Sequence, residues 1–284
     1  MERLVTSTAP FTYPCIIEYS LICSAITYVM WKHTGKNPSK RKVVQYGEKN
    51  EVKESYSFDC HGANKGLFGG IMVLIFTLIS LIMFFMVENN DEFEDSTAVI
   101  TARCSEIILY VLSMIAVIGA FHRMRTLGYD SHHEMELDHI LLLVAQTGLF
   151  MYSIFVIVGG HSLYKVENLL TFFAGITEFI QGTLQTMFLL HASRCYAKTF
   201  KHEANKPGRE LVTFLIMANL SMWAVNTFET LNASLHPGQF EFYGMWAWTI
   251  ILHLSMPLAI FYRFHSTVCL CEVWVTAYSR SHTA

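Results

Sequence analysis

The sequence has 284 residues, of which 52% are hydrophobic and only 15% are charged, and its mean hydropathy is +0.35. This composition is typical of a membrane protein and excludes an ordinary soluble domain. The net charge of -3 gives no basis for binding nucleic acid. The seven cysteines form no Cys-x-x-Cys pair, so we expect neither a zinc site of that kind nor a disulfide framework.

Seven apolar segments are long enough to cross a membrane as helices. A hydrocarbon core about 30 Å thick requires about 20 apolar residues of helix. The segments cover, in chain order, residues 11–32, 66–87, 98–121, 137–159, 168–192, 211–231 and 243–264. We therefore predict an all-α, multipass transmembrane bundle. The first ten residues lack a basic stretch followed by an apolar run, so we expect no cleaved signal peptide.

Lysine and arginine are distributed unevenly between the two sides of the predicted bundle. If the spans alternate in direction, 17 of the 20 basic residues lie on one side, with Arg263 counted there as part of the C-terminal tail. The positive-inside rule makes this side cytoplasmic. The other side carries an acidic run at 88–95 and a glycosylation sequon at Asn232. We predict that the N-terminus is outside the cell and the C-terminus inside.

The predicted span 168–192 carries three polar residues on one face. Glu178, Gln181 and Gln185 follow one another at intervals of three and four residues, which places them on the same side of a helix. A charged side chain at the bilayer centre costs about 2.5–3.5 kcal/mol even on the scales that rate it lowest. We therefore expect this face to contact protein or water. Asn219, in the span 211–231, is a further inward candidate.

Other polar residues inside the predicted spans raise the same question. Glu18 and Glu106 are carboxylates in the first and third spans, and each needs water or a partner in the membrane. His253 and Tyr262 lie nine residues apart in the last span, which is about 180° on a straight helix. They share a face only if Pro257 kinks or rotates that helix.

Several longer stretches resemble the otopetrin family of proton channels. They are "YPCIIEYSLI" at 13–22, "ELDHILLLVAQTGLFMYSIF" at 136–155, "ITEFIQGTLQT" at 176–186, "KPGRELVTFLIMANLSMW" at 206–223 and "YGMWAWTIILHLSMPLAIFYRFHSTVCLCEVW" at 243–274. Otopetrins have twelve spans in two related halves. The resemblance implies that residues 1–33 match the last span of the N-terminal half, 34–64 form a basic cytoplasmic linker, and 65–284 match the six-helix C-terminal half. About five further spans would then lie upstream of this chain.

The resemblance also implies a function and partners. Otopetrins are proton-selective channels of the plasma membrane, so we expect passive proton flux into the cell when the extracellular pH falls. No cofactor is implied, and no enzyme motif is present. The family forms dimers, so we expect a homodimer that contacts membrane lipid and the N-terminal half of the fold. The alternatives are a truncated, non-conducting chain that acts only by assembly with full-length subunits and, more distantly, a seven-span receptor whose usual motifs are missing.

Site residues follow from the same resemblance. The constricted Gln–Asn–Tyr constellation of the family corresponds here to Gln181, Asn219 and Tyr262. The candidates for proton relay or gating are Glu178, His253, Glu106, Glu18 and Gln185. The external loop histidines His161 and His236 are candidates for acid sensing or for binding the zinc ion that blocks channels of this family.

Each of these residues also has a purely structural interpretation. Amides in membrane helices often hold neighbouring helices together. Tyr262 could anchor the helix at the membrane interface, and His253 could be an ordinary buried histidine. The run His132, His133 and Glu134 lacks the i, i+4 spacing of a helical zinc site, so we expect no resident metal.

Overall fold

The computed structural model describes residues 16, 19–28, 30–31, 63–88, 95–130, 137–161, 165–231 and 237–279. In chain order its elements are α2 (Asn64–Glu88), α3 (Asp95–Met124), β1 (Gly128–Tyr129), α4 (Leu137–Gly160), α5 (Val166–Ala192), β2 (Cys195–Tyr196), α6 (Phe200–Asn205), α7 (Arg209–Leu231), α8 (Pro237–Tyr243) and α9 (Met245–Thr276). A helix over Tyr19–Tyr28 precedes them. Six of the predicted segments therefore coincide with long helices.

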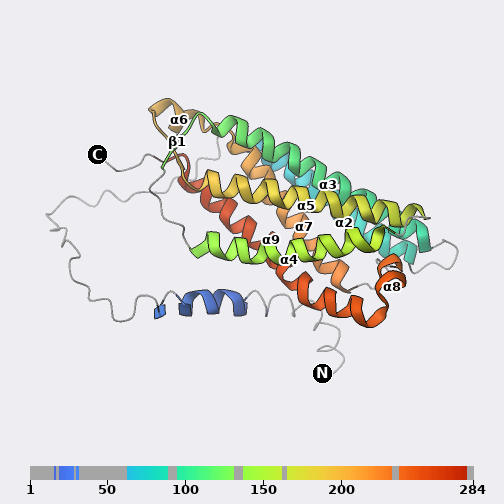
Figure 1. Ribbon diagram of the computed structural model, residues 1–284. Helices are drawn as coiled ribbons and strands as arrows, with labels where there is room; N and C mark the ends of the chain where they lie inside the picture. Colours follow the sequence, from blue (N-terminus) through green and yellow to red (C-terminus); the bar gives the residue numbers. More distant parts are fainter. Residues whose placement is uncertain are drawn as a thin grey trace, which may run out of the picture.

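Five of the long helices form a closed ring. α3 packs against α5, α5 against α4, α4 against α9, α9 against α7, and α7 against α3. α2 packs on α7 and α3 from outside this ring (Figure 1). Apolar side chains fill much of the interior, and Leu142, Leu149, Leu215 and Met256 are fully buried in a single cluster.

Glycines allow the helices to approach one another closely. A Cβ atom added at Gly66 would lie 1.7 Å from the carbonyl oxygen of Glu210, which joins α2 to the start of α7. One added at Gly148 would lie 2.1 Å from the Cβ atom of Leu258, which joins α4 to α9. Close packing of this kind drives helix association in membranes, where lipid tails are as apolar as the side chains.

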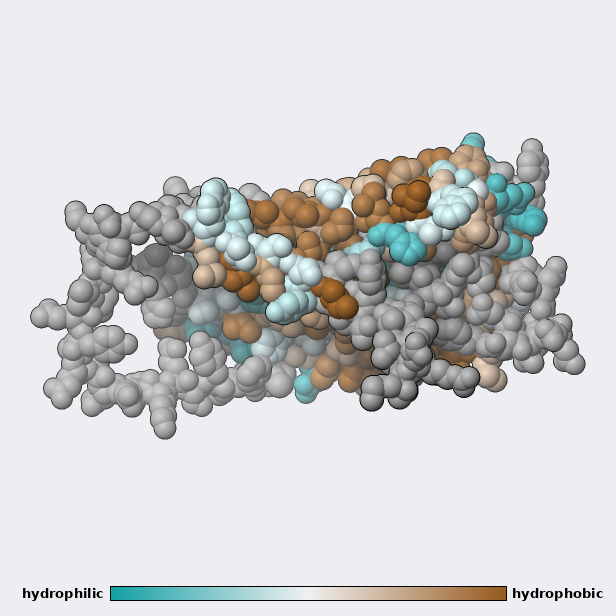
Figure 2. All heavy atoms as spheres, turned by 90° about the horizontal axis from the view of Figure 1, so that it is seen from below, coloured by the Kyte–Doolittle hydropathy of each residue, from teal (hydrophilic) through white to brown (hydrophobic). Residues whose placement is uncertain are grey.

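The outer faces of the helices are apolar, as expected of a bundle in lipid. Among the described residues, five helical stretches are long and apolar enough to cross a membrane, namely Asn64–Phe84, Thr97–Met124, Leu137–Gly160, Arg209–Phe228 and Met245–Thr276. Apolar side chains make up much of the coloured surface in Figure 2. α5 has 27 residues, enough to span the core, but polar residues on its inner face make its composition less apolar. The prediction of a helical membrane protein is thus confirmed, whereas a count of seven spans remains a prediction.

One end of the bundle is tied together by backbone hydrogen bonds. The loop after α3 and the loop after α5 pair as two short antiparallel strands, with Tyr129 opposite Cys195. The amide of Ala197 donates to the carbonyl of Ser279, so the chain after α9 joins the same end (Figure 1). Burial raises the pKa of the Cys195 thiol to about 11 and keeps it protonated at neutral pH. The two loops and the end of α9 lie together, as alternating spans require, and the membrane side that this end faces remains a prediction.

The last helix corrects the sequence-based boundary. The predicted span ended at residue 264, but α9 continues to Thr276 and contains Pro257 without ending there. Arg263 is therefore not part of a cytoplasmic tail, because it lies inside α9 and is fully buried. The excess of basic residues on the predicted cytoplasmic side does not depend on this one residue.

Some of the predicted sites lie outside the described residues. These are Glu18, His236 and Asn232, together with the run 132–134.

Candidate functional site

The polar face of α5 lies inside the ring of helices. Glu178 is 2% exposed, and both Gln181 and Gln185 are completely buried. The face therefore contacts protein, on neighbouring helices of the ring.

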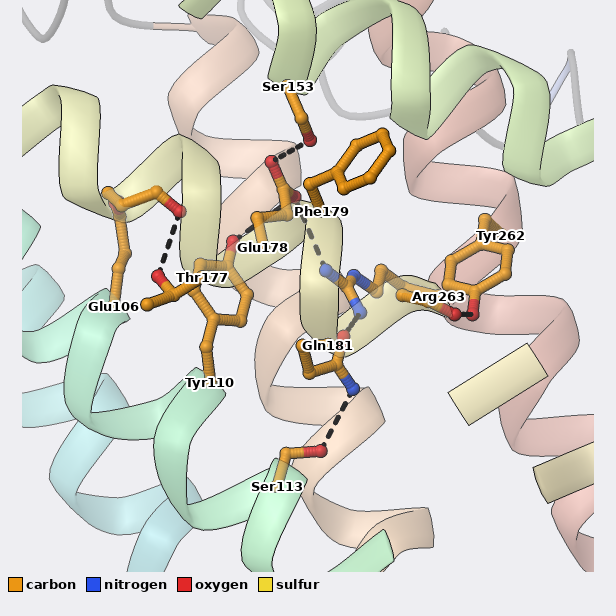
Figure 3. Close-up of polar contacts among 12 residues, drawn as sticks. Glu106, Tyr110, Ser113, Ser153, Thr177, Glu178, Phe179, Gln181, Tyr262 and Arg263 are labelled. Carbon is orange, nitrogen blue, oxygen red and sulfur yellow. Dashed lines mark hydrogen bonds and ion pairs between the residues drawn. The ribbon is translucent and has the colours of Figure 1, made fainter. Parts of the chain in front are cut away.

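Glu178 is the centre of a group of contacts from three other helices. Its Oε1 atom accepts hydrogen bonds from the Tyr110 hydroxyl on α3, at 3.2 Å, and from the Arg263 guanidinium on α9, at 3.3 Å. Its Oε2 atom accepts from the Ser153 hydroxyl on α4, at 3.0 Å. The carboxylate and guanidinium form an ion pair shielded from lipid (Figure 3). A buried charge in a membrane needs such a partner.

Arg263 also connects the carboxylate to the first amide. One terminal nitrogen of its guanidinium donates to the Gln181 carbonyl oxygen, and the other to Glu178 (Figure 3). The Gln181 amide nitrogen donates in turn to the Ser113 hydroxyl, at 3.0 Å, and to the Gln185 carbonyl oxygen, at 2.8 Å. The ion pair and the amides therefore form one network.

Gln185 and Asn219 form a reciprocal amide pair between α5 and α7. The Gln185 nitrogen donates to the Asn219 oxygen at 2.7 Å, and the Asn219 nitrogen donates back at 3.0 Å. The Asn219 nitrogen also donates to the Leu215 carbonyl. Gln185 thus links Gln181 to Asn219, two of the three residues of the expected constellation.

Tyr262 contacts the same helix through different atoms. Its hydroxyl donates to the Gly182 carbonyl at 2.9 Å. Since a phenol has one proton to donate, the 2.9 Å contact with the Thr186 hydroxyl has Thr186 as donor. Glycine is needed at position 182, because a Cβ atom added there would lie only 2.5 Å from a side-chain carbon of Leu149. The hydroxyl of Tyr262 is therefore bonded to α5 beside the amides and not to the amides themselves.

Glu106 forms a second buried ion pair, with a residue of the same helix α3. It lies 2.6 Å from Arg103, three residues earlier on the same helix, and both side chains are buried. Tyr110 lies four residues after Glu106 and so shares its face of α3. This second pair therefore lies along the same side of α3 as the donor to Glu178.

The prediction that His253 faces the interior is wrong. Its side chain is exposed on the outer surface of α9, with Nδ1 2.8 Å from the Thr249 carbonyl oxygen. Tyr262 is completely buried. Nine residues of helix separate opposite faces, and Pro257 does not bring the two side chains onto one face. His161 is exposed at the end of α4, as expected of a loop histidine.

Sequence reasoning missed the residue with the most contacts to the network. Arg263 was counted with the tail because it lies at the very end of the predicted span 243–264, whereas α9 continues twelve residues further, to Thr276. Tyr110 and Ser113 follow Glu106 at intervals of four and three residues, a helical spacing that could have identified them. Ser153 carried no comparable signal, because single serines in apolar helices usually bond to their own backbone.

The amide oxygens of the network are already engaged in hydrogen bonds. Within the described ranges, no group of three or more His, Cys, Asp or Glu residues is arranged to hold a metal ion. The carbonyl oxygens of Gln181, Gln185 and Asn219 each accept a hydrogen bond from a neighbouring side chain. The arrangement therefore suits proton exchange between hydrogen-bonded groups better than coordination.

Comparison with known proteins identifies the family of the chain. The profile described as Otopetrin matches residues 1–264. The chain belongs to the otopetrin family. The family assignment favours a channel over the seven-span receptor that the topology alone had left open.

Individual otopetrins show how much of the family's length is present. The chain is 46% identical to "Proton channel OtopLc" of Drosophila melanogaster over 284 residues, which cover 99% of this chain and 18% of that protein. It is 25% identical to human "Proton channel OTOP3", covering 93% of this chain and 51% of that protein. It is 21% identical to mouse "Proton channel OTOP2", covering 57% of that protein. The chain thus spans between about a fifth and somewhat over half of the length of these relatives.

Proposed function

We propose that this otopetrin chain contributes a proton-selective pathway across the plasma membrane and passes protons inward when the extracellular pH falls. The observation that carries the proposal is the buried network from Tyr110 and Ser153 through Glu178 to the amides of Gln181 and Asn219. Proton pathways in membranes are built from such chains of titratable and hydrogen-bonding groups.

The groups differ in what they can do with a proton. The Glu178 carboxylate can bind one, and the hydroxyls of Tyr110 and Ser153 can each accept one while donating another. The amides of Gln181 and Gln185 donate and accept hydrogen bonds but do not titrate at physiological pH. We therefore assign uptake to Glu178 and the constriction to the amides. Because the amides bond to one another, water must replace some of these bonds before protons can pass.

The outer surface of the chain favours assembly with further protein. His253 lies about 12 Å along α9 from its first residue, at a depth where lipid is a poor host for a polar ring. A second copy of this chain, or the upstream helices of the family fold, would cover it. This exposed histidine also favours the second candidate function, in which the chain does not conduct and acts only by assembly with full-length subunits.

The test is a measurement of acid-evoked proton current divided by the amount of chain at the cell surface. The chain is expressed alone and together with the upstream helices of the family fold. We expect little current from the chain alone and a clear current from the combination. The combination is also measured with Ile180→Leu as a control for substitution on α5. The Ile180 side chain is exposed, and leucine has the same volume. Surface-delivered combinations that pass no proton current would contradict the proposal.

A further inference from the structure

We propose that Arg263 makes the network selective by excluding metal cations from it. The inference rests on the proposed function in part, because it assigns selectivity to the same network. Arg263 is a positioning and specificity residue in this role and does not itself transfer a proton. Arg103, another buried arginine, pairs with Glu106 on α3.

The first reason is that Arg263 covers the oxygens a cation would need. Its two terminal nitrogens donate to the Glu178 carboxylate and to the Gln181 carbonyl. Hard cations are held by several oxygens at once, from carboxylates and amide or backbone carbonyls. The carboxylate supplies the negative charge that would attract a cation, and one guanidinium holds both it and the neighbouring amide oxygen.

The second reason is that the Arg263 guanidinium is held firmly in its position. The guanidinium is held between two aromatic rings, with its central carbon 5.3 Å from the Tyr110 ring centre and 5.5 Å from that of Tyr262. Such contacts stabilise a cation over the ring faces. A metal cation would have to displace a guanidinium that both rings and the ion pair with Glu178 hold in place.

A proton is not excluded in the same way. It needs a single lone pair on the Glu178 carboxylate and forms a covalent O–H bond there. Rotation of one hydroxyl donor, from Tyr110 or Ser153, exposes such a lone pair. A sodium ion would require the guanidinium to leave both of its acceptors. Arg263 thus separates the two ions by the number of oxygens that each requires.

The test measures binding of radioactive sodium (²²Na⁺) to the purified chain in lipid nanodiscs, which requires no current. We expect no saturable binding to the wild type and saturable binding to Arg263→Gln, because the carboxylate and the Gln181 oxygen are then uncovered. The double variant Arg263→Gln with Glu178→Gln should lose the binding again. Arg263→Lys, which keeps the charge, should bind at least about tenfold less sodium than Arg263→Gln.

Folding is monitored by thermal melting in sodium chloride and in N-methylglucamine chloride. If Arg263→Gln is unstable, sodium should restore its melting transition and N-methylglucamine should not, since the ion would replace the missing guanidinium. Three results would overturn the proposal. They are saturable sodium binding by the wild type, equal sodium binding by the single and double variants, and identical melting of an unstable Arg263→Gln in both salts. Absence of proton current from the assembled wild type would instead count against the proposed function alone.

Discussion

Two buried ion pairs in the part of the bundle that the structure describes are built in different ways. Arg103 and Glu106 are three residues apart on α3, and their charged atoms are 2.6 Å apart. Arg263 and Glu178 are 85 residues apart, on α9 and α5, at 3.3 Å. The first pair can form on an isolated helix in the membrane, whereas the second exists only after the helices have assembled. Equal burial therefore does not imply an equal contribution to the stability of the bundle.

The two pairs differ in whether they persist when the helices are separated in the membrane, which is the reference state for the stability of the bundle. Polar contacts in membrane proteins contribute less than expected because the disassembled helices also find partners. Glu106 keeps its partner in that state, and Glu178 loses Arg263. The pair between α5 and α9 should therefore respond to movement of the helices, which is the property that a gated pathway requires.

The largest effect is expected for Arg263→Leu. It leaves the Glu178 carboxylate buried without its counter-charge and removes a donor to Gln181. Breaking a buried pair in this way costs about 3–5 kcal/mol. Unfolding of the purified chain in a detergent titration would measure the loss. A loss below about 1 kcal/mol would show that the carboxylate is neutral or solvated in the assembled bundle.

A smaller effect is expected for Tyr262→Phe, at the neighbouring position of α9. This change keeps the ring and removes only the hydroxyl that joins Gly182 and Thr186. Losing a neutral hydrogen bond of this kind costs about 1 kcal/mol. The same titration compares it with Arg263→Leu, and equal losses would mean that charge contributes nothing special at the contact between α5 and α9.

Gln181→Leu separates stability from conduction. We expect a loss of about 0.6 kcal/mol, the average for an interhelical hydrogen bond, but also loss of current, because leucine donates no hydrogen bond and excludes water. The measurement is proton current per surface channel in the assembled fold. Normal current per channel in Gln181→Leu, Asn219→Leu and Tyr262→Phe would refute the constriction and leave these residues as packing contacts.

The smallest effect is expected when the local pair on α3 is removed. The double variant Arg103→Gln with Glu106→Gln should lower the free energy of unfolding by less than about 0.6 kcal/mol, because that pair also forms in the separate helix. The control is Arg263→Gln with Glu178→Gln, which removes the same charges between two helices. If the α3 variant loses as much stability as the control, the distinction between the two pairs fails.

Helical periodicity was sufficient to predict most of the bundle and the inner face of α5. The spacing of Glu178, Gln181 and Gln185 implied a face directed away from lipid, and all three residues are buried. The lengths of the apolar segments also predicted the long helices, because a helix needs about 20 apolar residues to cross the membrane. These features depend only on residues near one another in the sequence.

Residues that depend on contacts between helices were harder to predict. Arg263 looked like the beginning of a tail, since no local pattern shows that Glu178 on another helix balances its charge. His253 looked like a core residue because it is a polar residue inside an apolar segment. Its exposure could not be predicted, since packing against α4 and α7 decides which face of α9 points inward. The short strand pair and α8 left no periodic signal, because each spans only a few residues.

The strand pair also gives the bundle a mechanical asymmetry. At that end, backbone hydrogen bonds join the loops after α3 and α5 and the chain after α9. At the other end, α8 is held on α4 by side-chain contacts such as the bond from the Tyr243 hydroxyl to the Phe155 carbonyl. We therefore expect the tied end to act as a pivot when the helices tilt. A rotation of 4° about it would move the far end of a helix about 36 Å long by roughly 2.5 Å, so small changes near the strands become large displacements at α8.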